Sequence, residues 1–341
     1  MQFPFSVRML RLAQTAIATS LILVGGGPRS FTLTRIFAEK ITIVSTPVQL
    51  DSRDAQRVRV GKLTLLSAWK LTSTSPQFGG WSGLDIVGDR ITVLGDYGSV
   101  LRFRLTRFGR AVDARIDPLP RGCGRLADKR DRDSESLARA PVGWWVGFEA
   151  RNRICRVTDD FSRGLAVSAP PQMARWRDAG GAEAIVALRD GRVLVFAERV
   201  PAGETARSLL IFGGDPTNAA TAVDARSYTP PKGYSPTDAA QLPDGRILVL
   251  NRRFSVFERF TTVLTVVDLN RFDGRGAIAG VPIARFAPPM LSDNFEGLAA
   301  TVENGHPIVW LISDDNFMSW QGNYLLKLAI DPAPERGVKP R

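Results

Sequence analysis

The sequence has a single histidine, His306, in 341 residues. A zinc centre built on several imidazoles, or a histidine base held by a second histidine, is therefore excluded. A Ser-His-Asp hydrolase is disfavoured as well, because Leu84 stands where the nucleophile motif begun by Gly80-Trp-Ser-Gly83 would need its last glycine. There is no Walker-type loop and no dinucleotide-binding glycine motif. These absences leave oxygen ligands and arginine as the groups available for chemistry.

Lysine is also scarce, since arginine supplies 38 of the 45 basic residues. Against 34 acidic residues this gives a net charge of +11, which favours an anionic partner. The composition is otherwise that of a globular protein, with 44% hydrophobic and 23% charged residues. The length suits one large closed β-domain or two average domains.

The N-terminus predicts export. Arg8 and Arg11 precede an apolar run over residues 12–24, and three glycines follow it. The run has the length of a secretory signal and is short for a spanning helix, so residues 1–27 are predicted to be a signal peptide, with an uncleaved membrane anchor as the alternative. Either places the folded part in the periplasm or on the cell envelope. Export also argues against a nucleic-acid partner.

Cysteine is rare, with Cys123 and Cys155 the two present. An oxidising compartment would allow them to form a disulfide. Two buried thiols are the alternative, because Cys155 lies in a strand-like run over residues 153–157.

One pattern returns five times at a spacing of about fifty residues. A polar residue opens a short segment, and a turn signal and a β-rich run follow it. The copies begin at Ser82, Glu135, Glu183, Asp238 and Glu296, and the runs cover 90–96, 144–149, 192–198, 246–251 and 308–314. Turn pairs such as Asp190-Gly191 suit two-residue hairpins. The pattern predicts an all-β fold, a β-propeller of four-stranded antiparallel blades.

The ends of the repeat predict how the ring closes. The last copy ends near Ile330 without room for an outer strand, and a strand-like run over 58–70 precedes the first copy. We therefore expect this N-terminal run to complete the last of five blades. Six blades are possible if 254–289 or the N-terminal run forms a divergent blade. The predicted domain organisation has a linker over 28–57, the propeller over 58–331 and a tail over 332–341.

Equivalent positions of a propeller converge around its channel, so the repeated acids should meet in two sets. The first is Glu135, Glu183, Asp238 and Glu296, with Ser82; the second is Glu149, Glu198 and Asp314, with Asp96 and Asn251. Clustered carboxylates raise one another's pKa unless a positive charge compensates them. A calcium ion would do so, and a ring of ion pairs with arginine is the alternative. We expect Glu135, Glu149, Asp238 and Asp314 to bind the metal and Glu183, Glu296 and Glu198 to be catalytic.

Arginines beside such acids predict an anion site. Arg199 and Arg252 follow equivalent strands and are expected to bind substrate with Asn316, although solvated surface arginines would look the same. Two segments rich in oxygen-bearing side chains, 292–296 and 312–317, are expected to form parts of one cation-binding or substrate-binding mouth of the channel. Two Asx turns are the alternative.

Three segments carry a family resemblance. Residues 235–253, 293–299 and 312–316 resemble the bacterial "esterase-like activity of phytase" family, and the likeness extends over about residues 60–331. The resemblance implies an exported propeller with phosphoester or ester hydrolase activity. Asn251 departs from the pattern, because Glu149 and Glu198 stand at the matching places, and this favours an asymmetric site.

The function expected from these features is an exported, monomeric, calcium-dependent hydrolase of phosphate esters or related esters, acting on a small anionic substrate at the channel mouth. Metal-polarised water would attack while arginines hold the phosphate. Two alternatives stay open: a lactonase-like or carboxylic-ester hydrolase, and a non-catalytic envelope scaffold for an anionic ligand.

Overall fold

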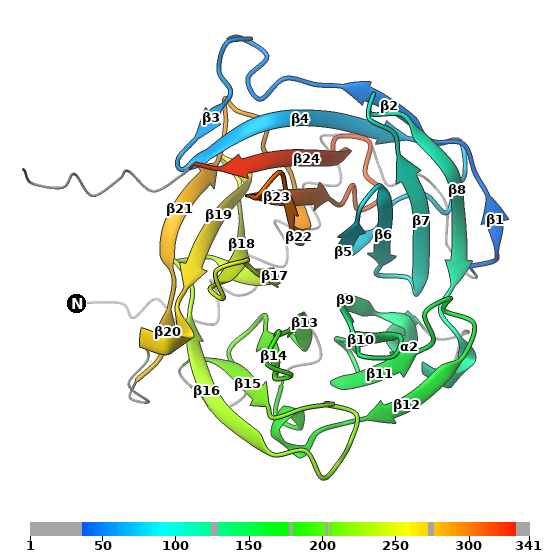
Figure 1. Cartoon of the computed structure of the whole chain (residues 1–341), viewed down its shortest axis with the longest axis vertical. Helices are drawn as coiled ribbons and strands as arrows, with labels where there is room; N and C mark the ends of the chain where they lie inside the picture. The colour runs from blue at the N-terminus through cyan, green and yellow to red at the C-terminus, as the bar shows by residue number, and fades with distance from the viewer. Residues whose placement is uncertain are drawn as a thin grey trace, which may run out of the picture.

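The protein is a five-bladed β-propeller (Figure 1). The computed structural model describes residues 36–331 apart from 124–128, 177–179, 202–203, 205 and 272–275. The five-blade prediction is confirmed and the six-blade alternative is wrong. The predicted signal or anchor over 1–27 and the tail over 332–341 lie outside the described residues. Within the described residues, no helix is long and apolar enough to cross a membrane.

Each blade is an antiparallel meander; in the first four blades the innermost strand comes first in the chain, whereas the N-terminal run supplies the outermost strand of the fifth. The first blade consists of β5 (Trp81–Val87), β6 (Arg90–Gly95), β7 (Ser99–Leu105) and β8 (Ala111–Pro118). The second consists of β9 (Ser134–Arg139), β10 (Trp144–Phe148), β11 (Arg153–Val157) and β12 (Gly164–Ser168). The third consists of β13 (Ala182–Ala187), β14 (Val193–Ala197), β15 (Arg207–Phe212) and β16 (Val223–Thr229).

The last two blades follow the same plan. The fourth consists of β17 (Ser235–Gln241), β18 (Ile247–Ser255), β19 (Arg259–Val267) and β21 (Val281–Phe286). The fifth consists of β22 (Phe295–Glu303), β23 (His306–Ser313), β24 (Asn323–Ile330) and β4 (Leu63–Thr72). The remaining elements are β1 (Glu39–Lys40), β2 (Val44–Pro47), β3 (Arg59–Val60), β20 (Ile278–Ala279), α2 (Lys129–Arg132) and the 3₁₀ turns Arg121–Cys123, Pro171–Met173 and Leu269–Arg271.

The second strand of each blade is its most apolar part. All five residues of β14, Val-Leu-Val-Phe-Ala, are buried, because both faces of the strand are covered by side chains. A strand that is covered on both faces has a continuous apolar sequence rather than an alternating one. The blades therefore pack on one another and leave the channel at the centre. One end of the channel forms a cavity of about 210 Å³ that all five innermost strands line.

The N-terminal run closes the ring, as the sequence predicts. β4 pairs antiparallel with β24 from Leu71 opposite Asn323 to Leu63 opposite Ile330. In Figure 1 the blue β4 lies beside the red β24. Part of the predicted linker over 28–57 also lies on the propeller, since β1 pairs with β8 and β2 pairs with β4.

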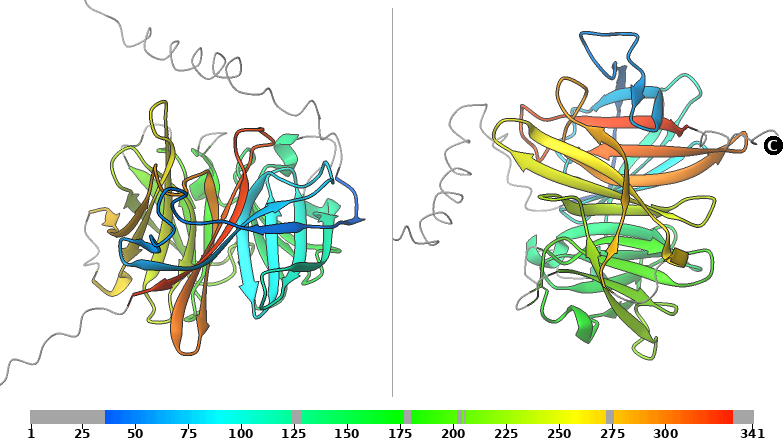
Figure 2. Two further views of the ribbon diagram at one scale, coloured as in Figure 1. Left: turned by 90° about the horizontal axis from the view of Figure 1, so that it is seen from above. Right: turned by 90° about the vertical axis from the view of Figure 1, so that its left-hand side faces the viewer.

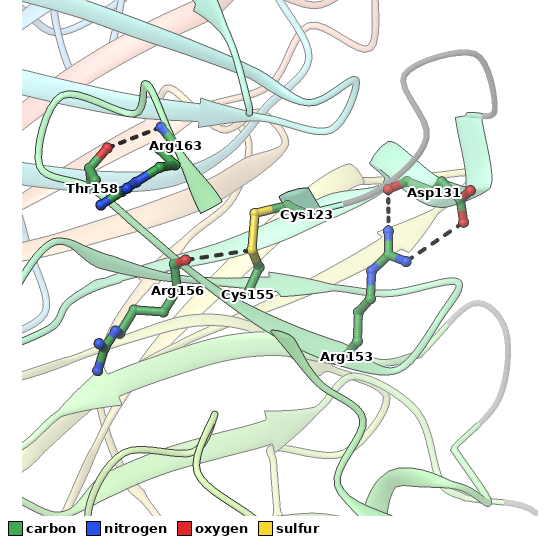
Figure 3. Close-up of a disulfide and its surroundings, with 7 residues drawn as sticks. All are labelled: Cys123, Asp131, Arg153, Cys155, Arg156, Thr158 and Arg163. Carbon is green, nitrogen blue, oxygen red and sulfur yellow. Dashed lines mark hydrogen bonds and ion pairs between the residues drawn. A yellow bond between two sulfur atoms is a disulfide. The ribbon is translucent and has the colours of Figure 1, made fainter. Parts of the chain in front are cut away.

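Cys123 and Cys155 form a disulfide, with their Cα atoms 5.5 Å apart (Figure 3). It joins the connection between the first two blades to β11. Arg153, two residues before Cys155, donates to the backbone oxygen of Asp131 in the same connection. The segment that leads into β9 is therefore held at two points.

Candidate functional site at the channel mouth

Every innermost strand contains a β-bulge at the same place. The pairing with the second strand skips one residue in each blade; these five residues, which we call the bulge ring, are Ser82, Glu135, Glu183, Thr237 and Glu296. A bulge turns its extra residue out of the normal strand alternation. Burial, and then the charges of Glu183, Asp96 and Glu296, raise the pKa of Glu135.

The bulge ring differs from the predicted set in the fourth blade, where it contains Thr237 and not Asp238. The Asp238 carboxylate accepts hydrogen bonds from the N–H groups of Leu298 (2.6 Å) and Ala239 (2.8 Å). Leu298 belongs to β22, so Asp238 links the fourth blade to the fifth. Ser136 stands at the matching position of the second blade, directly after the bulged residue. It also links two blades, because its hydroxyl donates to the Ala182 oxygen of the third blade (2.6 Å). The prediction therefore placed the fourth member one residue too late in the chain.

A second ring of side chains lies near the point where the pairing between the second strand and the innermost strand of each blade ends. Its members, the strand-end ring, are Asp96, Glu149, Glu198, Arg252 and Asp314. Asn251, the predicted member, pairs with Pro236 and is fully buried. Its side chain accepts from the Tyr228 hydroxyl (3.0 Å) of β16 in the third blade. The ring of acids is therefore interrupted by a guanidinium and not by an amide.

Arg252 compensates the acids on either side of it. Its guanidinium donates to Glu296, to Glu198 Oε1 (3.3 Å) and to Asn294 Oδ1 (2.7 Å). Burial disfavours the charge of Arg252, but Glu296 and Glu198 outweigh burial and raise its pKa above the usual range. The guanidinium is thus engaged by groups of the protein itself, whereas the sequence suggested that it binds substrate.

Three carboxylates from two blades form the strongest candidate metal centre. One oxygen from each of Glu149, Glu183 and Glu198 lies within 4.8 Å of the others. Within the described residues, Glu183 Oε2 is buried without a hydrogen-bond partner, and so is Thr237 Oγ1 in the next blade. Buried oxygens without partners are expected where a ligand completes the site. Oxygen-only ligands at this spacing fit a calcium ion.

The pKa shifts of this trio have the same physical origin. Burial first, and then Glu198 and Asp133, raise the pKa of Glu149 to about 7. Burial, followed by Glu198 and Glu149, raises the pKa of Glu183 well above its usual range. A second trio, Asp133, Glu135 and Glu149, shares Glu149 with the first. The predicted catalytic Glu183 and Glu198 and the predicted ligands Glu135 and Glu149 therefore belong to one continuous cluster.

The two oxygen-rich segments of the sequence meet on the fifth blade. Asn294 Nδ2 donates to Glu296 Oε1 (2.7 Å) and to Asp314 Oδ2 (3.3 Å). Asp314 Oδ1 also accepts from the backbone N–H of Asn316 (2.8 Å), which is an Asx turn, so both interpretations hold for this segment. The Asn316 side chain donates to Gln321 (3.4 Å). Burial first, and then Glu296 and Asp96, raise the pKa of Asp314.

Arg199 is the more accessible arginine of the mouth. Its side chain is 56% exposed, and its Nε donates to Glu198 Oε2 (3.1 Å). An exposed guanidinium beside the acids can bind an anionic group of a ligand.

The sequence interpretation missed Asp133 and Thr237 as members of the site, and it included Asn294 only as part of the oxygen-rich segment 292–296. Two of them shared a signal, because Asp133 and Asn294 each stand two residues before the bulged acid of their blade. Thr237 had a different signal, since it stands seven residues before the Asp244-Gly245 turn, as Glu183 does before Asp190-Gly191.

Comparisons with known proteins identify the family. The family model described as "Phytase-like: Esterase-like activity of phytase" matches residues 76–317. No curated protein matches the chain.

Solved structures of similar shape are remote. The major Malassezia sympodialis allergen Mala s 1 is 11% identical, and the match covers 86% of this chain and 96% of the allergen with a TM-score of 0.42. A hypothetical protein from Leishmania major is 14% identical, with coverages of 83% and 89% and a TM-score of 0.43. The calcium-binding protein regucalcin from Agrobacterium tumefaciens is 12% identical, with coverages of 90% and 96% and a TM-score of 0.39. At these scores none of the three bears on activity.

Proposed function

The chain belongs to the phytase-like family, which is described by the esterase-like activity of phytase, and we propose that it is a calcium-dependent hydrolase of phosphate esters or related esters. The observation that carries the proposal is the trio Glu149, Glu183 and Glu198, in which Glu183 Oε2 is buried without a partner. Three carboxylates this close need a cation to remain ionised together.

The trio would hold the calcium ion, and Glu135 and Asp133 form the second trio with Glu149. When bound, such an ion polarises an ester oxygen and activates water. Arg252 orients Glu198 and Glu296 by bonding to both. Arg199 is exposed beside Glu198 and would bind the anionic group of the substrate. Burial and the neighbouring acids raise the pKa of Glu135, so this carboxyl would retain a proton that it can donate to a leaving group.

A carboxylic ester or lactone is the second candidate substrate, and the charge of the mouth favours it. Seven carboxylates belong to the two rings: Asp96, Glu135, Glu149, Glu183, Glu198, Glu296 and Asp314. Arg252 is engaged by Glu198 and Glu296, which leaves Arg199 as an accessible positive charge beside Glu198. A polyphosphate would be repelled by this excess of acids, whereas a neutral or singly charged ester would not.

We place the enzyme in the periplasm or on the envelope, as a monomer. The Cys123–Cys155 disulfide supports this location, because disulfides persist in oxidising compartments.

The experiment is a metal analysis and calcium-dependent melting of the purified protein, followed by hydrolysis assays with a chromogenic phosphate monoester, phytate and a lactone panel. We expect bound calcium, calcium-dependent hydrolysis and its loss in Glu183→Gln. Glu303→Gln is the matched control, because Glu303 lies at the far end of β22 and pairs with Lys327. A protein that hydrolyses no ester, and loses anion binding in Arg199→Ala but not in Glu183→Gln, would instead be a binding scaffold.

A further inference from the structure

Aromatic side chains gather at the mouth beside the fourth and fifth blades. The rings of Phe254 and Phe260 are 5.0 Å apart, and Phe260 stacks on Trp320 at 6.1 Å with an interplanar angle of 10°. We call these three residues the aromatic stack. Phe254 and Phe260 face each other across the β18–β19 hairpin, and Trp320 belongs to the loop between β23 and β24. Figure 2 shows this hairpin turn projecting from one face of the propeller and the β22–β23 turn projecting from the other.

The aromatic stack is continuous with the acidic cluster. The guanidinium carbon of Arg252 lies 5.9 Å from the centre of the Phe260 ring, and the same guanidinium donates to Glu296 and Glu198. The mouth is therefore two-sided: metal-binding carboxylates lie on the second and third blades, and aromatic rings lie on the fourth and fifth.

The stack is presented at the surface and does not belong to a core cluster. Phe254 is 46% exposed, and Phe260 and Trp320 are half-buried. Arg259 also lies over the Trp320 ring, with its guanidinium carbon 5.2 Å from the ring centre. Arg259 has a φ of 55°, a left-handed conformation that a residue with a side chain adopts at a cost.

The loop that carries Trp320 is held in an unusual conformation as well. Asn316 and Phe317 have φ angles of 46° and 53°. The loop is kept there by hydrogen bonds from the Phe317 N–H to Asp315 Oδ1 (3.1 Å) and from the Gly322 N–H to Asp293 Oδ2 (3.0 Å). Strained backbone that the surroundings maintain is typical of ligand-binding segments. The fold thus supports Trp320 from both of its flanks.

We propose that the aromatic stack is a substrate subsite that binds an aromatic group, so that the enzyme prefers aryl esters carrying at most one anionic group. This inference rests on the proposed function and names its substrate class. The two sides of the mouth indicate which part of the substrate each side contacts. The reacting ester group must lie near Glu149, Glu183 and Glu198, where a second or third anionic group would be repelled, and the remainder of the substrate then faces the rings.

A flat uncharged ring suits this position because aromatic rings attract one another beyond the burial of their area. A different kind of partner would contact the exposed tip of the β18–β19 hairpin, where Phe257 is 99% exposed and Val256 is 59% exposed. A protein or membrane partner would require this tip, whereas the aryl subsite requires Trp320 and Phe260. The two can be separated by substitution.

The experiment measures binding of phenylphosphonate and methylphosphonate by calorimetry, with and without calcium. Neither probe is an ester, so turnover does not disturb the measurement. We expect phenylphosphonate to bind about tenfold more tightly, which is the order of one aromatic stacking contact together with ring burial. Trp320→Ala should reduce this preference to about twofold or less, and Trp320→Phe should retain most of it. Phe257→Ala is the control and should leave it unchanged; melting curves establish that each variant is folded.

Equal affinities for the two probes, or no binding of phenylphosphonate, would overturn the subsite. So would a preference that survives both Trp320→Ala and Phe260→Ala, or one that disappears in Phe257→Ala. Failure of the hydrolase is distinguishable: a phenyl preference without hydrolysis of any ester removes the enzymatic proposal alone, and calcium-dependent hydrolysis without a phenyl preference removes the subsite alone.

Discussion

The guanidinium of Arg252 joins Glu198 of the third blade to Glu296 of the fifth. It occupies the one place in the strand-end ring that is not acidic, and it is the internal counter-charge of a mouth crowded with carboxylates. This relationship makes the candidate site asymmetric, with the accessible Arg199 bonded to Glu198 Oε2 and the half-buried Arg252 bonded to Glu198 Oε1.

Removal of Arg252 should destabilise the fold, and calcium should reverse part of the loss. Arg252→Ala leaves Glu198 and Glu296 buried without compensation, which costs about 3 to 5 kcal/mol for a buried pair. Denaturant unfolding with and without calcium measures both effects. Arg104→Ala removes an exposed ion pair with Asp113 and is the control for loss of an arginine at the surface. An Arg252→Ala protein as stable as the unaltered one would contradict the counter-charge role.

Calcium affinity should rise with pH through about pH 7. The pKa of Glu149 is raised from its ordinary value of 4.5 to about 7, so between these values the folded protein binds more protons than the unfolded chain. The contribution of Glu149 to stability is therefore full below about pH 4.5 and is lost as the pH rises through about 7. Calcium requires the ionised carboxylate and should bind better as that proton leaves.

Calorimetric calcium titrations between pH 5.5 and 8.5 measure this dependence. Glu149→Gln should flatten the profile as well as weaken binding. An affinity that is constant across the range in the unaltered protein would show that Glu149 does not take part in binding.

Asp238 and Glu183 should respond differently to removal of their carboxylates. Asp238→Ala leaves the buried N–H of Leu298 without its acceptor, which costs about 1 to 3 kcal/mol in unfolding free energy. Calcium affinity should be unchanged, because Asp238 bonds to the backbone of β22 and β17 and lies outside both carboxylate trios. Glu183→Ala should abolish calcium binding. Loss of calcium binding in Asp238→Ala would return Asp238 to the metal site.

Loss of the disulfide should lower the free energy of unfolding. The bridge spans 32 positions, and the chain-entropy estimate for a loop of this length is about 3 to 4 kcal/mol. The double variant Cys123→Ser and Cys155→Ser should unfold at lower denaturant concentration than the oxidised protein, and added reductant should then have no further effect on it. An unchanged midpoint would mean that the packing around β9 and β11 holds the connection by itself.

The sequence by itself determined the architecture. Five copies of one strand pattern, turn pairs such as Asp244-Gly245, and a surplus strand before the first copy lead to a closed five-bladed ring, because each feature depends on local chemistry and on counting. The family likeness was also readable, since its motifs are contiguous in the chain.

Only the tertiary structure decided which polar residue of each repeat reaches the mouth. The fourth repeat shows the difference: its strand register puts Thr237 in the bulge and Arg252 at the strand end, where Asp238 and Asn251 were expected. The bond between Arg252 and Glu296 and the stacking of Phe260 on Trp320 bring together residues of different repeats. Such contacts depend on how the blades are placed around the channel, and spacing along the chain carries no information about them.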